Sequence, residues 1–104
     1  MDPRKKARLE EGGWRVGSAA DLLGMTPEES AYVDLRLKLS DAVRDLRKKK
    51  HLTQVQLAGM LGSSQSRVAK AEAGDDSVSL DLLIRSLLSL GATRRDLARV
   101  ISGG

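Results

Sequence analysis

The sequence predicts an all-α protein built from short helices, and three observations support this class. Only 2% of the 104 residues are aromatic, so the core must consist of Leu, Val, Ala, Ile and Met side chains. These residues, with abundant Arg, Glu and Lys and few β-branched runs, favour helices over a sheet. Helix-capping patterns recur along the chain, and a chain of this length supports one modest core.

Residues 1–25 are expected to form an N-terminal basic arm followed by a short helix, and residues 26–104 the folded domain. A short helix over residues 19–23 would be capped by Ser18 and stopped by Gly24. The basic residues of the arm are Arg4, Lys5, Lys6 and Arg8. They fit a segment that enters a DNA minor groove, and they equally fit a solubilising tail.

A long helix should begin at Thr26-Pro27-Glu28-Glu29, where Thr26 is a good N-cap and Glu29 completes a capping box. It should run to about Lys49. Its inward stripe consists of Tyr32, Leu35, Leu39, Ala42, Val43 and Leu46. Val33 and Leu37 form a second apolar edge that could receive Trp14, Leu22 and Leu23. Lys48–Lys50 suit the helix dipole and would also suit phosphate contacts.

Two short helices follow, joined by a tight turn. Thr53 and Gln56 make a capping box for the first, whose buried side should contain Val55, Leu57, Ala58 and Leu61. Gly62 should end it. Ser64 then caps a helix over residues 65–72 that turns Val68 and Ala71 inward and ends at Gly74.

The last two helices are predicted over residues 80–90 and from Thr93 onward. Ser79 caps the first, with Leu83, Ile84, Leu87 and Leu88 as its apolar stripe, and Gly91 closes it. Thr93 and Asp96 open the final helix, which carries Leu97, Val100 and Ile101. This C-terminal end has more apolar residues than one small core requires, which suits a homodimer interface.

Helices 53–61 and 65–72, joined by Gly62-Ser63-Ser64, together make a helix-turn-helix. In this motif the second helix presents its N-terminal residues to the DNA major groove. Here those residues are Gln65, Ser66 and Arg67, and Lys70 falls on the same helix face. The net charge of +4 is consistent with a polyanionic partner.

The segment Leu52-Thr53-Gln54-Val55-Gln56-Leu57-Ala58…Leu61-Gly62-Ser63-Ser64-Gln65-Ser66-Arg67-Val68 resembles the Xre family, the phage-repressor type of helix-turn-helix. The resemblance spans roughly residues 35–90. It implies a compact five-helix bundle of the lambda-repressor type that binds operator DNA as a homodimer and represses transcription. Ser63 departs from the pattern, because an apolar residue often stands there.

Residue by residue, the resemblance implies a DNA-contacting set of Thr53, Gln54, Ser64, Gln65, Ser66, Arg67 and Lys70. Gln54 would contact a phosphate and brace Gln65, and Gln65 would bind adenine through two hydrogen bonds. Arg47 and Glu72 match a structural ion pair of the family, which makes Glu72 a scaffold residue.

Residues 13–24, together with Thr26-Pro27-Glu28-Glu29, resemble the opening of some Xre proteins encoded beside RelE/ParE-type toxins. That resemblance implies a HigA-type antitoxin, which would neutralise a toxin protein and regulate its own gene. Trp14, Leu22 and Leu23 are then the candidate toxin-binding surface.

The sequence gives little support for an enzyme, a metal-binding protein, or a secreted or membrane protein. The chain has no Cys and a single His, so no metal, cofactor or enzyme site is expected. No signal peptide or membrane span is visible, which indicates a cytoplasmic protein. The alternative to a DNA reader is a protein-interaction module that retains the fold but does not read DNA sequence.

Overall fold

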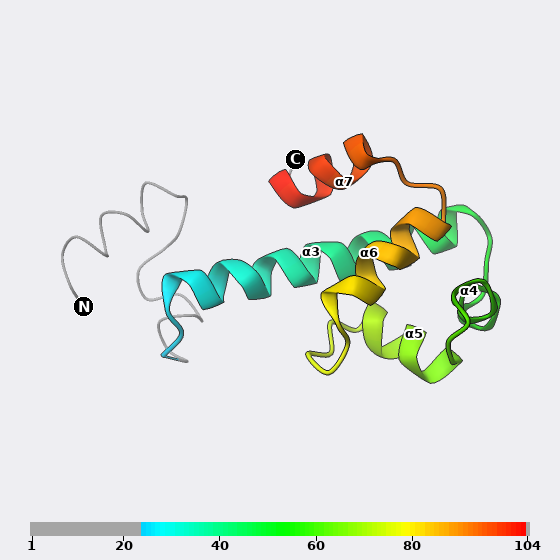
Figure 1. The fold of residues 1–104 in the computed structure, drawn as a ribbon, viewed down its shortest axis with the longest axis horizontal. Coiled ribbons are helices and arrows are strands. Elements are labelled where there is room, and N and C mark those ends of the chain that lie inside the picture. The colour runs from blue at the N-terminus through cyan, green and yellow to red at the C-terminus, as the bar shows by residue number, and fades with distance from the viewer. Residues whose placement is uncertain (1–23, 104) are drawn as a thin grey trace. The chain divides into compact units, whose positions relative to one another are not determined.

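The computed structural model describes residues 24–103, which form five α-helices (Figure 1). Their bounds are α3 Pro27–Lys49, α4 Gln54–Leu61, α5 Gln65–Glu72, α6 Leu80–Ser89 and α7 Arg94–Ser102. The predicted all-α, five-helix fold is confirmed. The predicted basic arm, the predicted helix over residues 19–23, and Trp14 lie outside the described residues, as do Leu22 and Leu23.

The chain divides into two compact units, residues 1–34 and 35–104. In the described part of the first unit, the Thr26 hydroxyl accepts the Glu29 N–H and donates to the Glu29 carboxylate, both at 3.1 Å. The prediction that α3 starts here is therefore confirmed. Tyr32 was predicted to face inward, but 47% of it is exposed, so the inward stripe of α3 begins at Leu35.

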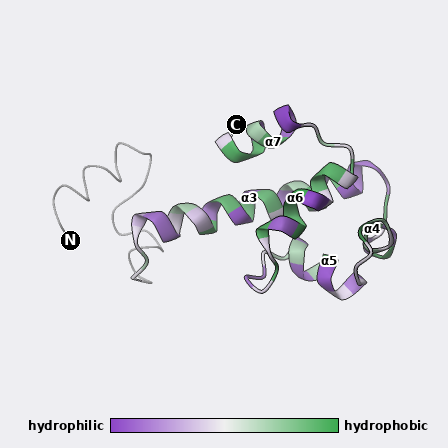
Figure 2. Cartoon of the chain, viewed as in Figure 1, coloured by the Kyte–Doolittle hydropathy of each residue, from purple (hydrophilic) through white to green (hydrophobic). Residues whose placement is uncertain are grey.

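The core lies in the second unit and is almost entirely aliphatic. Its members are Leu39, Val43, Leu57, Ala58, Leu61, Val68, Ala71, Val78, Leu82, Leu83, Leu87 and Leu90. Figure 2 shows hydrophobic and hydrophilic residues on different sides of the helices of this unit, as expected for helices half covered by a core. The final helix α7 packs through Leu97 and Val100, which are only partly buried.

Two further residues predicted to face the core, Val55 and Leu88, are exposed, as Tyr32 is. Val55 is 65% exposed, because it lies two residues before Leu57, about 200° around the helix from the buried side of α4. Leu88 is 47% exposed, since α6 turns Leu83 and Leu87 inward with Leu82 beside them. Helix α6 also ends at Ser89, one residue earlier than predicted, and Leu90 follows as a buried cap.

Among the described residues, no helix combines the length and hydrophobicity needed to cross a membrane.

Candidate nucleic-acid interface

Local hydrogen bonds set both ends of α4. The Thr53 hydroxyl accepts the Gln56 N–H at 3.0 Å, and the Gln56 side-chain oxygen accepts the Thr53 N–H at 2.8 Å. At the other end Gly62 adopts a left-handed conformation with φ of 64°. A residue without Cβ takes this conformation at little cost, so the chain can turn sharply from α4 into α5.

Helix α5 begins after Ser64, whose hydroxyl accepts the Arg67 N–H at 3.2 Å. Its inner side consists of Val68, Ala71 and Glu72, all buried. The predicted base-reading side chains Gln65, Ser66, Arg67 and Lys70 are all exposed. Helix α5 therefore has one buried face and one polar face open to solvent.

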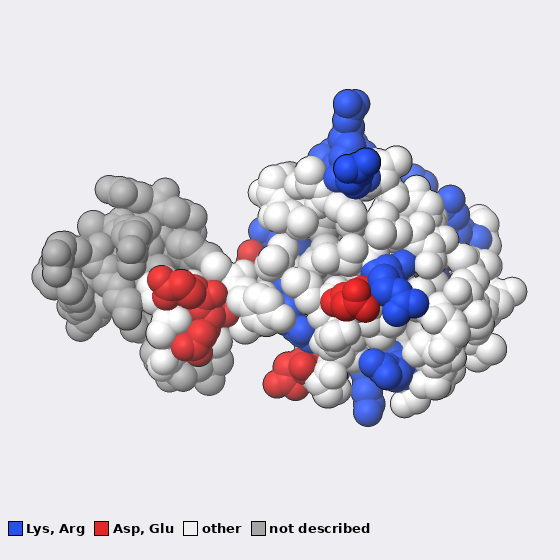
Figure 3. Space-filling model, viewed as in Figure 1, with Lys and Arg blue, Asp and Glu red and all other residues white. Residues whose placement is uncertain are grey.

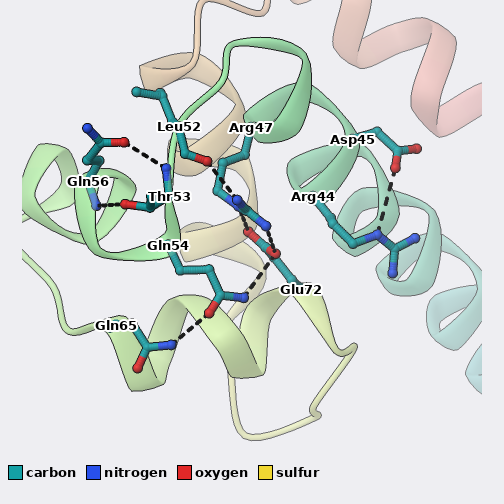
Figure 4. Close-up of polar contacts among 9 residues, drawn as sticks. All are labelled: Arg44, Asp45, Arg47, Leu52, Thr53, Gln54, Gln56, Gln65 and Glu72. Carbon is teal, nitrogen blue, oxygen red and sulfur yellow. Dashed lines mark hydrogen bonds and ion pairs between the residues drawn. The ribbon is translucent and has the colours of Figure 1, made fainter.

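Gln65 is held by the preceding helix. Its Nε2 donates to Oε1 of Gln54 at 2.7 Å, so the first residue of α4 touches the first residue of α5 (Figure 4). The contact implied by the family resemblance is thus present. It restricts the rotation of an exposed side chain that would otherwise sample several rotamers.

Beneath these glutamines lies a buried ion pair between α3 and α5. Arg47 Nε and Nη2 donate to the two Glu72 carboxylate oxygens at 2.5 and 2.9 Å, and Nη1 donates to the Leu52 carbonyl at 2.7 Å (Figure 4). The hydrogen bond to Glu72 raises the pKa of Arg47 above its ordinary value, and the opposing effect of burial is smaller. The Arg47 guanidinium therefore stays charged, and its hydrogen bonds to Glu72 join α3 to α5.

The glutamines and the ion pair are connected. Gln54 Nε2 donates to Glu72 Oε1 at 3.2 Å, the same oxygen that accepts from Arg47 Nη2 (Figure 4). Neither the helix pattern nor the family motif predicts this contact. Eighteen residues separate its partners, and no spacing rule relates a helix start to the end of the next helix.

A second buried arginine was also missed. Arg36 is 8% exposed and donates from Nη2 to the carbonyls of Asp75 at 2.8 Å and Val78 at 2.6 Å, in the loop between α5 and α6. Arg36, Ser40, Val43 and Arg47 recur at intervals of three or four residues and all are buried, but three of the four are polar, so a hydrophobicity pattern does not mark this face. Arg36 thus fixes the loop that follows the candidate interface.

Charge alone does not mark this interface. In Figure 3, Lys and Arg side chains occur at several separate places on the coloured part of the surface rather than in one patch. The case for the interface rests instead on hydrogen-bonding side chains gathered on one face of α5.

A groove of about 650 Å³ lies elsewhere, between α3, α6 and α7. None of its lining residues belongs to α4 or α5, so it forms no part of the candidate interface. Within residues 24–103 no cluster of His, Cys, Asp or Glu could hold a metal ion. The candidate partner-binding residues Trp14, Leu22 and Leu23 are not among the described residues.

The sequence of these helices matches the model of a known protein family. A family model described as "Helix-turn-helix" matches residues 43–97, just over half of the chain. The match contains α4, α5, α6 and all the candidate DNA-contacting residues. Searches of curated proteins and of solved structures returned no match.

Proposed function

Because this chain belongs to the helix-turn-helix family, in its Xre/Cro-C1 type, we propose that it is a transcriptional repressor that reads an operator sequence with α5. DNA binding itself is what membership of this family implies. The proposal adds that the contact is sequence-specific, that bound protein blocks transcription, and that the protein carries out no chemical step.

One observation carries the proposal: the exposed face of α5 offers four side chains that form hydrogen bonds, three of them in its first turn, while its other face is buried. A helix with this division can enter the major groove without uncovering its core. The Gln65 amide matches the donor and acceptor of adenine, whereas Arg67 and Lys70 can reach other bases or phosphates. Thr53, Gln54 and Ser64, at the helix starts, are the proposed phosphate contacts.

The proposal includes a homodimer, since two recognition helices one DNA turn apart would contact both halves of a palindromic operator. Its support is the exposed Leu88 on α6, 47% exposed, and Ile101 on α7, 50% exposed. Sedimentation equilibrium should show a dimer that Leu88→Ser or Ile101→Ser weakens. A monomer at every concentration would remove the dimer from the proposal.

The proposal extends to a toxin partner, in the manner of a HigA-type antitoxin. Its support is the sequence of residues 13–29, with Trp14, Leu22 and Leu23 as the binding surface. A neighbouring gene for a small basic RelE-like protein would supply the partner. Co-expression should then relieve that protein's toxicity, and Trp14→Ala should abolish the relief. If co-expression leaves the toxicity intact, the antitoxin role is wrong.

The deciding experiment is a fluorescence-anisotropy titration against the DNA upstream of the protein's own gene, with random competitor DNA present. Gln65→Ala should cost about 1–3 kcal/mol at the preferred site and relax one base preference. Arg85→Ala, which removes an exposed charge on α6, is the control and should bind as the unaltered protein does.

Two outcomes would contradict the proposal. Binding by the unaltered protein that random DNA competes away completely would argue for a protein-interaction module instead. Equal loss of affinity on all DNA in Gln65→Ala would leave DNA binding intact as a function but remove base reading from Gln65.

A further inference from the structure

We propose that Glu72, which is buried away from any DNA surface, determines which base Gln65 prefers. It acts as a positioning residue through Gln54, by fixing which way round the Gln65 amide lies. The proposal rests on the sequence-reading function above. It gives the ion pair a role in specificity beyond joining two helices.

The first step is the chemistry of the Glu72 carboxylate. An ionised carboxylate can only accept hydrogen bonds. The Glu72 side chain is 4% exposed, so little water can reach the carboxylate and bridge it to Gln54. Arg47 occupies both oxygens, and Gln54 approaches one of them at 3.2 Å. The group that Gln54 turns toward Glu72 must therefore be its amino group.

The second step follows from the planarity of the Gln54 amide. With its amino group on Glu72, its oxygen necessarily points the other way, toward Gln65 at 2.7 Å. The reversed Gln54 amide would set its oxygen against the carboxylate and its amino group against the amino group of Gln65. Because both contacts would then be repulsive, Glu72 selects a single orientation for both glutamines.

The third step concerns the hydrogen-bonding groups of Gln65 that remain free to contact a base. One hydrogen of its amino group is committed to Gln54, which leaves one N–H donor and the Oε1 acceptor. This pair matches adenine, whose N7 accepts and whose N6 donates in the major groove. Guanine presents two acceptors, O6 and N7, so one would face the Gln65 oxygen. The orientation that Glu72 imposes thus favours adenine over guanine.

Glu72→Gln tests this reasoning, because a neutral amide of nearly the same size no longer fixes an acceptor opposite Gln54. Its amino group faces an Arg47 donor in either orientation, so neither orientation is favoured and the amino group faces Gln54 in part of the molecules. Gln54 and Gln65 could then both reverse, and Gln65 would present two N–H donors that guanine accepts. We expect the ratio of adenine to guanine affinity at the Gln65-dependent position to fall roughly tenfold.

The measurement begins with duplexes selected by the unaltered protein from a randomised library. Gln65→Ala identifies the position that Gln65 reads, and affinities are then measured for duplexes that differ only by A or G there. Glu28→Gln, an exposed change of the same kind in the first turn of α3, is the control and should leave the ratio unchanged.

Gln54→Leu is the second variant, and it guards against loss of folding in Glu72→Gln. It leaves the Arg47–Glu72 pair intact but removes the hydrogen bonds that join Gln54 to Glu72 and to Gln65. The ratio of adenine to guanine affinity should therefore fall in this variant also. Any lost phosphate contact weakens both duplexes equally and cancels in the ratio. If Gln54→Leu folds and its ratio equals that of the unaltered protein, the proposal is wrong.

A DNA-free readout separates this proposal from the proposed function. In NMR spectra of the free protein, the Gln65 side-chain amide protons should shift in Glu72→Gln and Gln54→Leu but not in Glu28→Gln. Unaltered protein without any base preference, yet with these shifts, would refute the base-reading function while the orienting contact stands. Unshifted Gln65 protons in both variants would overturn the orienting contact itself.

Discussion

At the scale of single residues, two arginines of α3 lie three positions apart in very different surroundings. Arg44 forms an ion pair with Asp41 at 3.1 Å, and the two side chains are 41% and 62% exposed. The Arg47 and Glu72 side chains are 11% and 4% exposed. A buried pair is not by itself a strong source of stability, but removing one partner strands the other charge in the interior.

We therefore expect Arg47→Ala to lower the free energy of unfolding by about 3–5 kcal/mol, because Glu72 is left uncompensated. Arg44→Ala should lower it by less than about 1 kcal/mol, since solvent screens that pair. Urea unfolding of both variants checks this. Similar losses in the two variants would mean that Glu72 finds another partner when Arg47 is absent.

Some of the side-chain contacts could be predicted from the sequence, and others could not. The Gln54–Gln65 and Arg47–Glu72 contacts were implied by a family motif, and the structure contains both. The Gln54–Glu72 contact and the role of Arg36 were missed. A long polar side chain between apolar positions is ordinarily solvated, and only the packed neighbours show that Arg36 is covered.

At the scale of elements, one glycine lies inside α4 and a second forms its C-cap. A Cβ added at Gly59 or at Gly62 would meet no atom within 4 Å, so neither position is crowded. They differ in backbone conformation, because Gly59 lies inside the helix whereas Gly62 has φ of 64°.

Gly59→Ala should raise the free energy of unfolding by about 0.5–1 kcal/mol, since Ala is the better helix former. Gly62→Ala should lower it by about 1 kcal/mol, because Ala is strained in the left-handed region. Thermal unfolding of the two variants compares them. Equal shifts would show that backbone conformation does not govern the end of α4.

Helix α7 depends on its first turn, because none of its residues is fully buried. Thr93 and Asp96 form a capping box, and Asp96 also contacts Arg99. The hydrogen bonds from Thr93 are the largest cause that lowers the pKa of Asp96, followed by the bond from Arg99. The charged form of Asp96 is thus favoured in the folded state.

The lowered pKa of Asp96 predicts that α7 opens in acid. The stabilising effect of Asp96 is complete above the ordinary aspartate pKa of about 3.9, and it disappears as the pH falls through the lower folded value. Amide hydrogen exchange should therefore show α7 opening below about pH 4 ahead of α4. Asp96→Asn is the control, and its α7 should show much weaker pH dependence. Simultaneous opening of α7 and α4 would contradict the prediction.

At the scale of the whole molecule, the net charge of +4 gives DNA binding a component that does not depend on sequence. Each phosphate contact releases counterions, so affinity falls as salt rises. Variants must locate the charges that contribute, because the basic side chains lie at several separate places on the one face that Figure 3 shows.

Lys70→Gln should reduce the slope of log affinity against log salt by about 1, because Lys70 is exposed on the proposed DNA-binding face. Arg85→Gln removes an equal charge from α6 and should leave the slope unchanged. Binding titrations at several salt concentrations measure both. A loss of slope in Arg85→Gln as large as that in Lys70→Gln would show that overall charge drives the binding.

The sequence by itself determined where α4 and α5 begin and where α4 ends, since capping residues such as Thr53 and Ser64 and the stop at Gly62 act on backbone groups within a few residues. It also determined which face of α5 is polar. Tertiary structure alone decided that Leu88 is exposed, that Arg36 is buried, and that Glu72 reaches Gln54. Those outcomes depend on how helices far apart in sequence pack together, and a local pattern does not contain the position of the neighbouring helix.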